Sequence, residues 1–341
     1  MARQPTLKVK EISTITNLSV HSIYRIINEK KLPVINQGNK KLLPPNTVRE
    51  IFESRAFTYK RNVKPKVINI FGMKGGIGKT SLATAIAEGS SRLGFRVLAI
   101  DIDMQGNLTQ AFDKKDPSNK VLYDIISEEA SIDETLIKVN SHLSIIPSSL
   151  VNSGLELYMS TKEIDTPHYF DSLFNRVYSQ FDLIVIDCPP SVNKITTCAT
   201  CFATTNIIPV NADTDSFDGV SMSVGEIKRL EKAFHRSGLK INYRIVFNKY
   251  DAREKLSLGI MGQIAQDDEL AKNLLQIVVR TDTAFKNTKA ECSSIFDVNR
   301  SAGKEDCLAL ISELTGIYDW VENSGGENKQ SQGASEEVMV G

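Results

Sequence analysis

The chain has few of the features that mark secreted, disulfide-stabilised or membrane-inserted proteins. It contains one tryptophan, four histidines and five cysteines in 341 residues. No apolar run approaches the roughly 20 residues that cross a bilayer, and the N-terminus lacks the apolar segment of a signal peptide. An odd number of cysteines in a long chain does not indicate a disulfide framework. These absences predict a reduced, cytoplasmic protein without membrane attachment.

The chain also has no excess of charge of either sign, but the charge is unevenly distributed. Lys and Arg total 41, as do Asp and Glu, yet residues 1–62 hold 12 basic and only 4 acidic residues. A small basic segment joined to an acidic body favours a nucleic-acid-binding appendage, although a solvated basic face would give the same composition.

The basic segment carries a helix-turn-helix pattern. Apolar residues recur at helical spacing over residues 8–15 and 20–29, residues 16–19 form the turn, and Ser19 is a suitable N-cap. A hairpin or wing over residues 32–43 and a helix over 47–55 follow. We predict a helix-turn-helix DNA-binding domain over residues 1–56 and a basic linker over 57–66. The alternative is a small helical module that docks a protein partner.

Helix-turn-helix geometry predicts which side chains would meet DNA. The N-terminal residues of the second helix read base edges in the major groove. Arg25 is the best candidate for a guanine because its guanidinium can bond to two acceptors at once. Wing lysines would meet phosphates and set position rather than sequence. The predicted DNA contacts are Ser19, His21, Ser22, Arg25, Lys40 and Lys41.

From residue 67 the pattern changes to short apolar runs that alternate with amphipathic stretches. This alternation predicts an α/β domain over residues 67–320, with a mainly parallel, doubly wound sheet and helices on both faces. Residues 321–341, rich in Gly, Ser, Gln and Glu, predict a disordered tail. Strands are expected at residues 67–71, 96–100, 143–146, 183–186, 207–210, 244–247 and 277–279, and long helices at 80–93, 217–234 and 304–314.

A glycine-rich segment, Gly72-Met73-Lys74-Gly75-Gly76-Ile77-Gly78-Lys79-Thr80-Ser81, follows the first of these strands and opens a helix. Glycines let backbone amides curl around phosphate oxygens, and the helix N-terminus favours negative charge. Lys79 would reach the β- and γ-phosphates, and Thr80 would ligate magnesium. The segment predicts a nucleotide site formed by Lys74, Gly75, Gly76, Ile77, Gly78, Lys79, Thr80 and Ser81.

Two further segments complete a family pattern. Residues 101–107 read Asp-Ile-Asp-Met-Gln-Gly-Asn, and an apolar run delivers Asp187 at residues 181–187. With the additional lysine of the loop, Lys74, and with Met73 where a general P-loop has glycine, the sequence resembles the ParA/MinD group of P-loop ATPases over residues 66–316. Met104 stands where that group usually has proline, and residues 278–282 differ from its Ile-Pro-Arg-Asn segment.

The resemblance implies an ATPase with slow turnover that uses ATP and Mg²⁺. It assigns water positioning to Asp103, magnesium binding to Thr80, Asp187 and Asp101, and the adenine edge to Asn248, which lies in the matching segment 245–253. Lys74 would cross to the partner's phosphates in an ATP-dependent homodimer. The catalytic set implied in this way is Lys74, Lys79 and Asp103.

The leading functional hypothesis is a nucleoid-associated DNA-partition ATPase. Its ATP-bound dimers would bind DNA nonspecifically, a ParB-like partner would stimulate hydrolysis, and the N-terminal domain would bind its own operator. Two alternatives are an ATP-gated transcriptional regulator and a metabolic ATPase of the same superfamily.

Cys198 and Cys201 are expected to be buried core thiols rather than metal ligands. The nonspecific surface is predicted at Arg253, Lys255, Lys286, Lys289 and Arg300.

Overall fold

The structure is a computed structural model that describes residues 5–59, 64–291 and 293–323. Its central feature is an eight-stranded sheet built from β4 (Lys66–Ile70), β5 (Val97–Asp101), β6 (Ile137–Lys138), β7 (Leu143–Ile146), β8 (Leu183–Asp187), β9 (Thr205–Val210), β10 (Tyr243–Tyr250) and β11 (Leu274–Arg280). The strand order is β11-β10-β9-β4-β8-β5-β7-β6. Only the edge strand β6 pairs antiparallel; the other neighbouring pairs are parallel. The predicted mainly parallel α/β class is confirmed.

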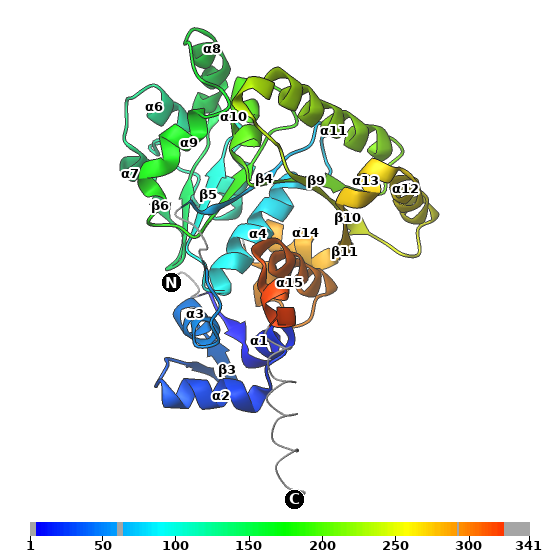
Figure 1. Ribbon diagram of the computed structural model, residues 1–341. Coiled ribbons are helices and arrows are strands. Elements are labelled where there is room, and N and C mark those ends of the chain that lie inside the picture. The colour runs from blue at the N-terminus through cyan, green and yellow to red at the C-terminus, as the bar shows by residue number, and fades with distance from the viewer. Residues whose placement is uncertain (1–4, 60–63, 292, 324–341) are drawn as a thin grey trace, which may run out of the picture.

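Helices cover both faces of this sheet (Figure 1). One face carries α4 (Lys79–Arg92), α14 (Thr283–Ala290) and α15 (Ala302–Thr315), and the other carries α10 (Lys194–Phe202) and α11 (Ser216–Ala233). The remaining helices are α5 (Asn107–Ala111), α6 (Leu122–Ile126), α7 (Ile132–Thr135), α8 (Leu155–Ser160), α9 (Tyr169–Phe174), α12 (Lys255–Gln266) and α13 (Asp268–Asn273). Short 3-10 turns lie at Leu150–Gly154, Asn175–Val177, His235–Ser237 and Ile295–Asp297.

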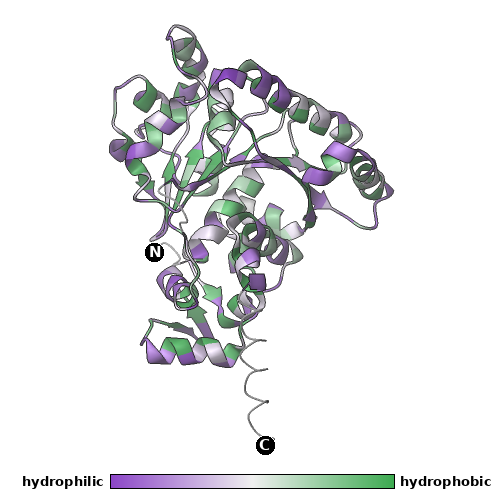
Figure 2. Ribbon diagram, in the orientation of Figure 1, coloured by the Kyte–Doolittle hydropathy of each residue, from purple (hydrophilic) through white to green (hydrophobic). Residues whose placement is uncertain are grey.

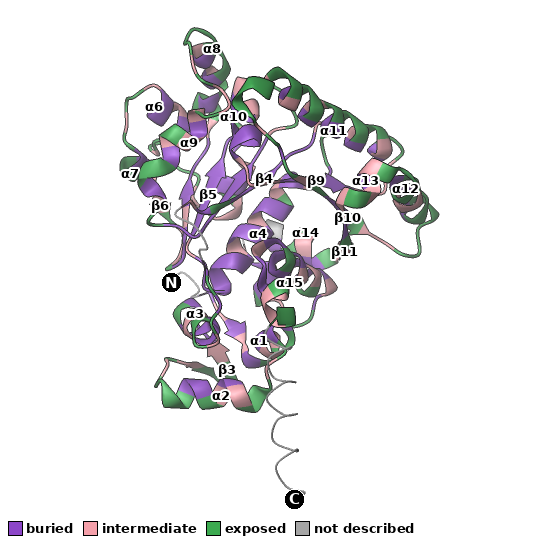
Figure 3. Cartoon of the chain, viewed as in Figure 1, coloured by how far each residue is buried: buried purple, intermediate pink, exposed green. Residues whose placement is uncertain are grey.

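The strands are buried on both sides, which explains their continuous apolar runs. Along β4, Ile68 and Ile70 enter the core beneath α4 and α15, whereas Val67 enters the core on the opposite face. Successive side chains of a strand point to opposite faces, so a strand covered on both sides needs apolar residues throughout. Figures 2 and 3 show this as hydrophobic, buried strands beneath helices whose outer surfaces are hydrophilic and exposed.

Residues 5–59, called here the N-terminal module, form a separate group of elements. They are β1 (Leu7–Lys8), α1 (Val9–Thr16), α2 (Val20–Glu29), β2 (Ile35–Gln37), β3 (Lys40–Leu43) and α3 (Pro45–Glu53), with antiparallel strand order β1-β3-β2. Asn17 adopts φ 55° between α1 and α2, and Ser19 Oγ accepts the N–H of Ser22 at 3.0 Å. Asparagine tolerates this left-handed conformation. The two helices and the hairpin therefore occur where the sequence predicted them.

The N-terminal module packs firmly against the body, partly through residues predicted as linker. Phe57 and Tyr59 are buried, and their rings lie 5.3 Å from Trp320 and 4.7 Å from Phe95, respectively. Aromatic side chains bury large apolar areas. Burial of Phe57 and Tyr59 therefore holds this segment against the body even though the residues around them in the chain are polar. Phe57 and Tyr59 are thus part of the core rather than of a tether, whereas Thr58 between them is exposed. Residues 60–63 of the predicted linker and 324–341 of the predicted tail lie outside the described residues.

A buried carboxylate also joins the N-terminal module to the body. Asp182 accepts hydrogen bonds from Arg49 Nη1 on α3 (2.7 Å) and from Arg96 Nη2 (2.7 Å), and its side chain is fully buried. Burial acts to raise the pKa of Asp182, but the hydrogen bonds from Arg96 and Arg49 outweigh it and hold the pKa below 3.8. This stabilisation is complete above pH 3.8 and is lost as the pH falls through the lowered pKa.

Asp182→Ala should therefore lower the free energy of unfolding at pH 7 by about 3 kcal/mol, because it leaves arginine donors without their buried acceptor. Chemical denaturation of both proteins measures the difference, which should shrink as the buffer is made more acidic. Asp165→Ala is the matched control, since that carboxylate is exposed and pairs only with His168. Equal stability of Asp182→Ala and wild type at pH 7 would contradict the assigned role.

The expectation that Cys198 and Cys201 are buried thiols can be compared with the structure. Cys198 and Cys201 are buried and unpaired, as predicted for core thiols, and burial raises the pKa of each thiol to about 12. Among the described residues, no group of three or more His, Cys, Asp and Glu side chains is placed to hold a metal ion. In the same part of the chain, every helix is too short or too polar to cross a membrane.

Candidate functional site

The glycine-rich loop connects β4 to α4 at the carboxyl edge of the sheet. Gly76 and Gly78 adopt φ 75° and 91°, in the left-handed region. At Gly78 a Cβ atom would lie only 2.2 Å from Nδ2 of Asn248. Glycine is therefore required there for both conformation and space. Because parallel strands bring ligands to their carboxyl ends and a helix N-terminus offers unpaired amides, this loop is placed to bind phosphate.

Lys79 begins α4 and points back into the loop. Its side chain is buried, and Nζ donates to the main-chain oxygen of Lys74 at 2.7 Å. Burial lowers the pKa of Lys79, while the carboxylates of Asp187 and Asp103 act to raise it. The ammonium thus lies between the loop and two acids, where it can exchange a backbone oxygen for a phosphate oxygen.

Asp101 and Asp187 end neighbouring strands and face each other in register. Thr109 donates its N–H (2.8 Å) and its hydroxyl (2.7 Å) to Oδ2 of Asp101. Burial raises the pKa of Asp101 to about 6, against these hydrogen bonds. Burial also raises the pKa of Asp187 well above its ordinary value, Asp101 adds to the rise, and the Thr80 side chain opposes it. Two carboxyl groups are thus held together away from water.

These acids fit a hard divalent cation. Oδ1 of Asp101 and both carboxylate oxygens of Asp187 are buried without a hydrogen-bond partner among the described residues. Buried polar atoms are ordinarily paired, so three such oxygens in one place require an explanation. Mg²⁺ prefers oxygen ligands and is held by few protein groups. Asp187 and Thr80 are suited to hold it, with Asp101 beside them.

Asp103 lies just beyond the end of β5, at the wall of a cavity. Its Oδ1 accepts the N–H of Gln105 at 3.0 Å, and Gly106, at φ 63°, turns the chain into α5. A Cβ on Gly106 would lie 2.9 Å from the main-chain oxygen of Ser148. Local backbone geometry therefore fixes the carboxylate of Asp103 close to the phosphate loop. Met104, in place of proline, does not prevent this arrangement and is 43% exposed.

The cavity has a volume of about 720 Å³, within the roughly 300–1,000 Å³ typical of ligand pockets. It brings most of the predicted site together, while Lys74, Ile77, Asn248 and the two buried acids do not line it. The sequence interpretation missed several lining residues, including Lys249 and the segment from Asn152 to Glu156, which carries no recognisable motif. The predicted residues that line it are Gly75, Gly76, Gly78, Lys79, Thr80, Ser81 and Asp103.

Asn248 and Lys249, at the end of β10, hold the glycine-rich loop from outside. Asn248 Nδ2 donates to the oxygen of Ile77 at 2.8 Å, and Lys249 Nζ donates to the oxygen of Gly76 at 2.9 Å. Lys249 has φ 57°, a conformation that non-glycine residues rarely adopt. The assignment of Asn248 to the adenine edge stays a prediction. The contacts of Asn248 and Lys249 add a role in shaping the glycine-rich loop.

Lys74 points away from the cavity. Its Nζ lies 2.9 Å from Oδ2 of Asp213, an ion pair without hydrogen-bond geometry. Its methylene groups pack near Gly219 on α11, where a Cβ would lie 3.2 Å from Cβ of Lys74. Lys79 already serves the loop from within the subunit, so the side chain of Lys74 is not needed for that purpose here. The pair with Asp213 was not foreseen from the sequence.

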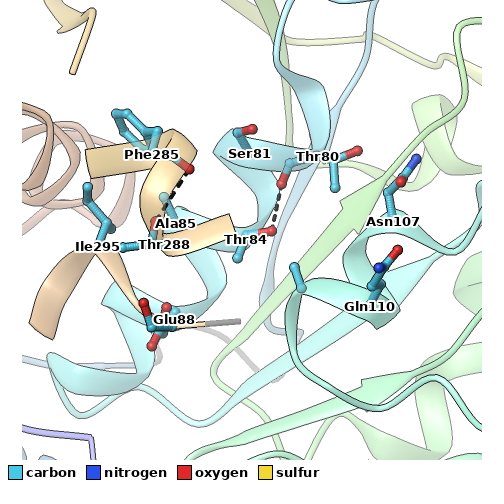
Figure 4. Close-up of a pocket in the computed structure, with 12 residues that line it drawn as sticks. Thr80, Ser81, Thr84, Ala85, Glu88, Asn107, Gln110, Phe285, Thr288 and Ile295 are labelled. Atoms are coloured by element: carbon cyan, nitrogen blue, oxygen red, sulfur yellow. Dashed lines mark hydrogen bonds between the residues drawn. The ribbon is translucent and has the colours of Figure 1, made fainter. Parts of the chain in front are cut away.

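A second cavity lies behind the loop, between α4, α5 and α14 (Figure 4). Thr80, Ser81 and Asn107 line both cavities. Figure 4 shows the hydroxyl of Thr84 bonded to the oxygen of Thr80, at 2.7 Å. The second cavity has a volume of about 110 Å³, below the roughly 300 Å³ of a small-ligand pocket, so it does not accommodate a nucleotide.

Comparison with known proteins begins with a family model. The model described as AAA domain, AAA_31, matches residues 65–241, just over half of the chain. The match begins next to β4 and contains the glycine-rich loop, Asp103 and Asp187. The N-terminal module lies outside it.

Two curated relatives cover most of the same region. The sporulation initiation inhibitor protein Soj of Bacillus subtilis is 28% identical over 254 residues, which cover 73% of this chain and 98% of that protein. The chromosome partitioning protein ParA of Caulobacter vibrioides is 29% identical over 205 residues, covering 59% of this chain and 74% of that protein. The resemblance to ParA-type ATPases is thus supported by proteins of that name.

Solved structures share the fold. The ATP complex of a Cyanothece McdA variant has a TM-score of 0.66 at 21% identity and covers 74% of this chain and 97% of its own. Cobyrinic acid a,c-diamide synthase from Mycobacterium smegmatis, with bound ADP and magnesium, scores 0.63 at 19% identity, covering 75% and 96%. A putative plasmid partition protein from Borrelia burgdorferi, bound to AMPPNP, scores 0.60 at 22% identity, covering 75% and 98%. With the loop, the acids and the family match together, the chain belongs to the AAA domain family AAA_31 and is an ATPase.

Proposed function

We propose that this protein is an ATP-dependent DNA-partition ATPase that dimerises on ATP, binds DNA, responds to a ParB-like partner and regulates its own operon. The observation that carries the proposal is one cavity in which the glycine-rich loop, Lys79 and Asp103 meet. Beside it lie two buried acids, Asp101 and Asp187, with carboxylate oxygens that no described residue hydrogen-bonds. ParA and the Borrelia protein supply the partition context by their names. The metabolic alternative has a fold relative in the diamide synthase, so fold alone does not separate the two.

Hydrolysis in this site is a matter of positioning and charge. Lys79 and the loop amides neutralise phosphate oxygens, and Asp103 orients the attacking water. Thr80 and Asp187, supported by Asp101, would hold Mg²⁺, which would supply positive charge against the phosphates. Before ATP arrives, Lys79 bonds to a loop oxygen instead. Nucleotide binding replaces that internal bond, so the lysine does not pay a new desolvation cost.

A second copy of the chain is the proposed cover for the cavity. One exposed apolar residue lines it and four others lie within two residues of its lining in the chain, and exposed apolar side chains that gather in a patch ordinarily mark an interaction surface. Dimerisation would bring Lys74 to the partner's phosphates after it leaves Asp213. The exposed apolar residues are Met104, Leu150, Val151, Leu157 and Val192, of which Leu150 and Leu157 are 70% and 73% exposed.

The N-terminal module is proposed to bind DNA through α2 and the hairpin. His21 and Arg25 are exposed on α2, and Arg25 is held only by a long, 3.9 Å pair with Glu29. The hydroxyls of Ser19 and Ser22 bond to each other at 2.9 Å, and the Ser19 hydroxyl also caps the helix, so both hydroxyls lie at the N-terminus of α2, where DNA would be met. A cation–π contact holds Lys41 on Tyr24 of α2, which supports wing and helix acting together.

A separate, nonspecific surface on the body is proposed from exposed cations. Arg253 pairs with Asp251, whereas Lys255, Lys286 and Arg300 are exposed. The side chain of Lys289 lies outside the described residues. Binding through such groups would be independent of sequence and would weaken steeply with salt, as counterion release requires.

The ATP-gated regulator is retained as a second candidate because the N-terminal module contacts the helix that starts at the nucleotide site. Arg92, near the end of α4, is buried and donates to the oxygen of Thr6 at 2.9 Å. A conformational change at Lys79, the first residue of α4, can therefore be transmitted to the N-terminal module through α4. This packing also means that deleting residues 1–62 would expose the core, so point variants give the cleaner test.

Arg25→Ala should abolish a discrete footprint on the protein's own promoter region while leaving ATP-dependent binding to random DNA. Loss of a bidentate contact predicts binding to the protected site about 10- to 100-fold weaker. Arg229→Ala is the matched control, because that arginine is equally exposed and also pairs with a glutamate on its own helix.

Three outcomes decide between the candidates. A footprint that survives Arg25→Ala would contradict the assignment of α2. An ATPase rate that random DNA does not change, together with an ATP-dependent footprint, would favour the regulator. DNA-stimulated hydrolysis with ATP-dependent random-DNA binding supports partition.

A further inference from the structure

A polar cleft separates the hairpin of the N-terminal module from the loop that precedes α15. It has a volume of about 630 Å³ and is called here the junction cleft. Lys8, Glu11 and Lys40 line it from the module, and Asp297, Asn299 and Lys304 line it from the body. Neither the nucleotide site nor the predicted recognition helix contributes to its lining.

The two carboxylates of the junction cleft are each paired with a buried cation. Glu11 pairs with Lys304 at 2.5 Å, and Asp297 pairs with Arg92 at 3.0 Å. Both cations are almost completely buried. Lys304 thus neutralises Glu11 within the cleft wall, whereas Arg92, which lies outside the lining, is shared between Asp297 and Glu88.

Lys8 and Lys40 remain without a carboxylate partner in the described part of the chain, and they converge. Their ammonium groups donate to the same atom, Oδ1 of Asn299, at 3.4 Å and 3.2 Å, and Lys8 also reaches its main-chain oxygen at 3.3 Å. An amide oxygen carries no net charge, so two positive charges repel each other across it. Burial lowers the pKa of Lys8 against the opposing charge of Glu11, and the other cations around the cleft lower it further.

We propose that the junction cleft binds a backbone phosphate of DNA held by the N-terminal module. The geometry favours an oxyanion, because two ammoniums that converge on a neutral acceptor gain a shared counter-ion when a phosphate replaces it. Asn299 belongs to the ATPase body, so a phosphate bound here ties DNA to both parts of the chain at once. This inference rests on the proposed function and extends it from the module to the junction.

The test uses the full chain and a fluorescent duplex from its own promoter region, titrated at several salt concentrations. Replacing both lysines, Lys8→Gln with Lys40→Gln, should weaken binding about 10-fold and lower the slope of log affinity against log salt by about 1. Lys31→Gln is the control: an exposed lysine of the same module, outside the cleft. Lys31→Gln should change the DNA affinity and the salt slope much less than the double lysine variant does.

Asn299→Asp separates anion binding from a structural role. The new carboxylate would pair with both lysines, so the folded state should be at least as stable in a thermal melt. If the cleft binds phosphate, this variant should nevertheless bind DNA more weakly, because the new carboxylate neutralises the charge of Lys8 and Lys40. If the lysines merely hold the module to the body, Asn299→Asp should bind DNA like the wild type, and the proposal fails.

The remaining outcomes are also decisive. If wild type binds the duplex and the double lysine variant binds equally well with the same salt slope, the cleft assignment fails while the proposed function stands. If wild type binds no DNA under any nucleotide condition, both fail. Inorganic pyrophosphate is the free-anion probe in a parallel titration. Pyrophosphate binding that needs Lys8 and Lys40, with DNA binding unaffected, would assign the cleft to a free anion and overturn the DNA assignment.

Discussion

Replacing Lys79 with alanine is expected to lower ATP turnover by at least about 100-fold, the effect of removing a preorganised donor from a developing negative charge. Lys79 is the buried cation that lies between the loop and the carboxylates of Asp187 and Asp103. Its loss removes charge neutralisation at the phosphates and leaves the acids to repel them. Nucleotide binding should fall as well, measured by isothermal titration alongside steady-state phosphate release.

Lys115→Ala provides the matched control for Lys79→Ala. Lys115 is exposed and donates to the oxygen of Gln105 at 3.2 Å. The substitution therefore removes a positive charge near the cavity, but one that does not line it. Its turnover should stay within about 2-fold of wild type, as for a distant charge in water. Wild-type turnover by a folded Lys79→Ala protein would show that the phosphate site has been misassigned.

Asp103→Ala is expected to separate ATP binding from hydrolysis. The phosphate loop stays intact, whereas the carboxylate that orients water is lost, so turnover should fall about 100-fold or more. ATP would then persist, and a dimer held together by ATP would accumulate. Size-exclusion chromatography with ATP and magnesium measures the dimer, and single-turnover kinetics measure the chemical step.

Two variants sharpen the Asp103 experiment. Asp103→Asn keeps an oxygen for the N–H of Gln105, so the loop retains its local hydrogen bond and only the charge is lost. It should behave like Asp103→Ala, whereas Asp133→Ala, an exposed acid on α7, should behave like wild type. Adding Lys74→Ala to Asp103→Ala should remove the dimer while ATP still binds. Normal hydrolysis by Asp103→Asn would assign water positioning to another group, and a dimer that survives Lys74→Ala would argue against the crossing lysine.

The body of the fold could be predicted because its signals are local. Strand β8, for example, is a continuous apolar run that ends in Asp187, and the observed strand differs from the predicted one by that residue alone. Helix α3 starts at Pro45, two residues before the predicted start, because proline suits the first turn of a helix. The short edge strand β6 was missed, since two residues carry no period to recognise.

The candidate site was predictable wherever backbone conformation restricts the amino acid. Gly76 and Gly78 adopt left-handed angles, and Lys79 follows them directly, so its side chain turns back to the oxygen of Lys74 in the same loop. Lys249 and Asp213 were missed because each contacts the loop from a distant strand end or turn. A single sequence carries no periodic signal for a contact between segments so far apart.

By itself, the sequence determined the strand-loop-helix segment of the candidate site, the alternation that gives a parallel sheet, and the helices of the N-terminal module. These follow from steric limits on glycine and from the spacing of apolar residues, both of which act within a few residues. Only the tertiary structure decided that Phe57 and Tyr59 pack against Trp320 and Phe95, that Asp101 and Asp187 meet in register, and that Lys8 and Lys40 converge on Asn299. Those contacts join residues far apart in the chain, and their energies depend on burial and charge that exist only once the chain has folded.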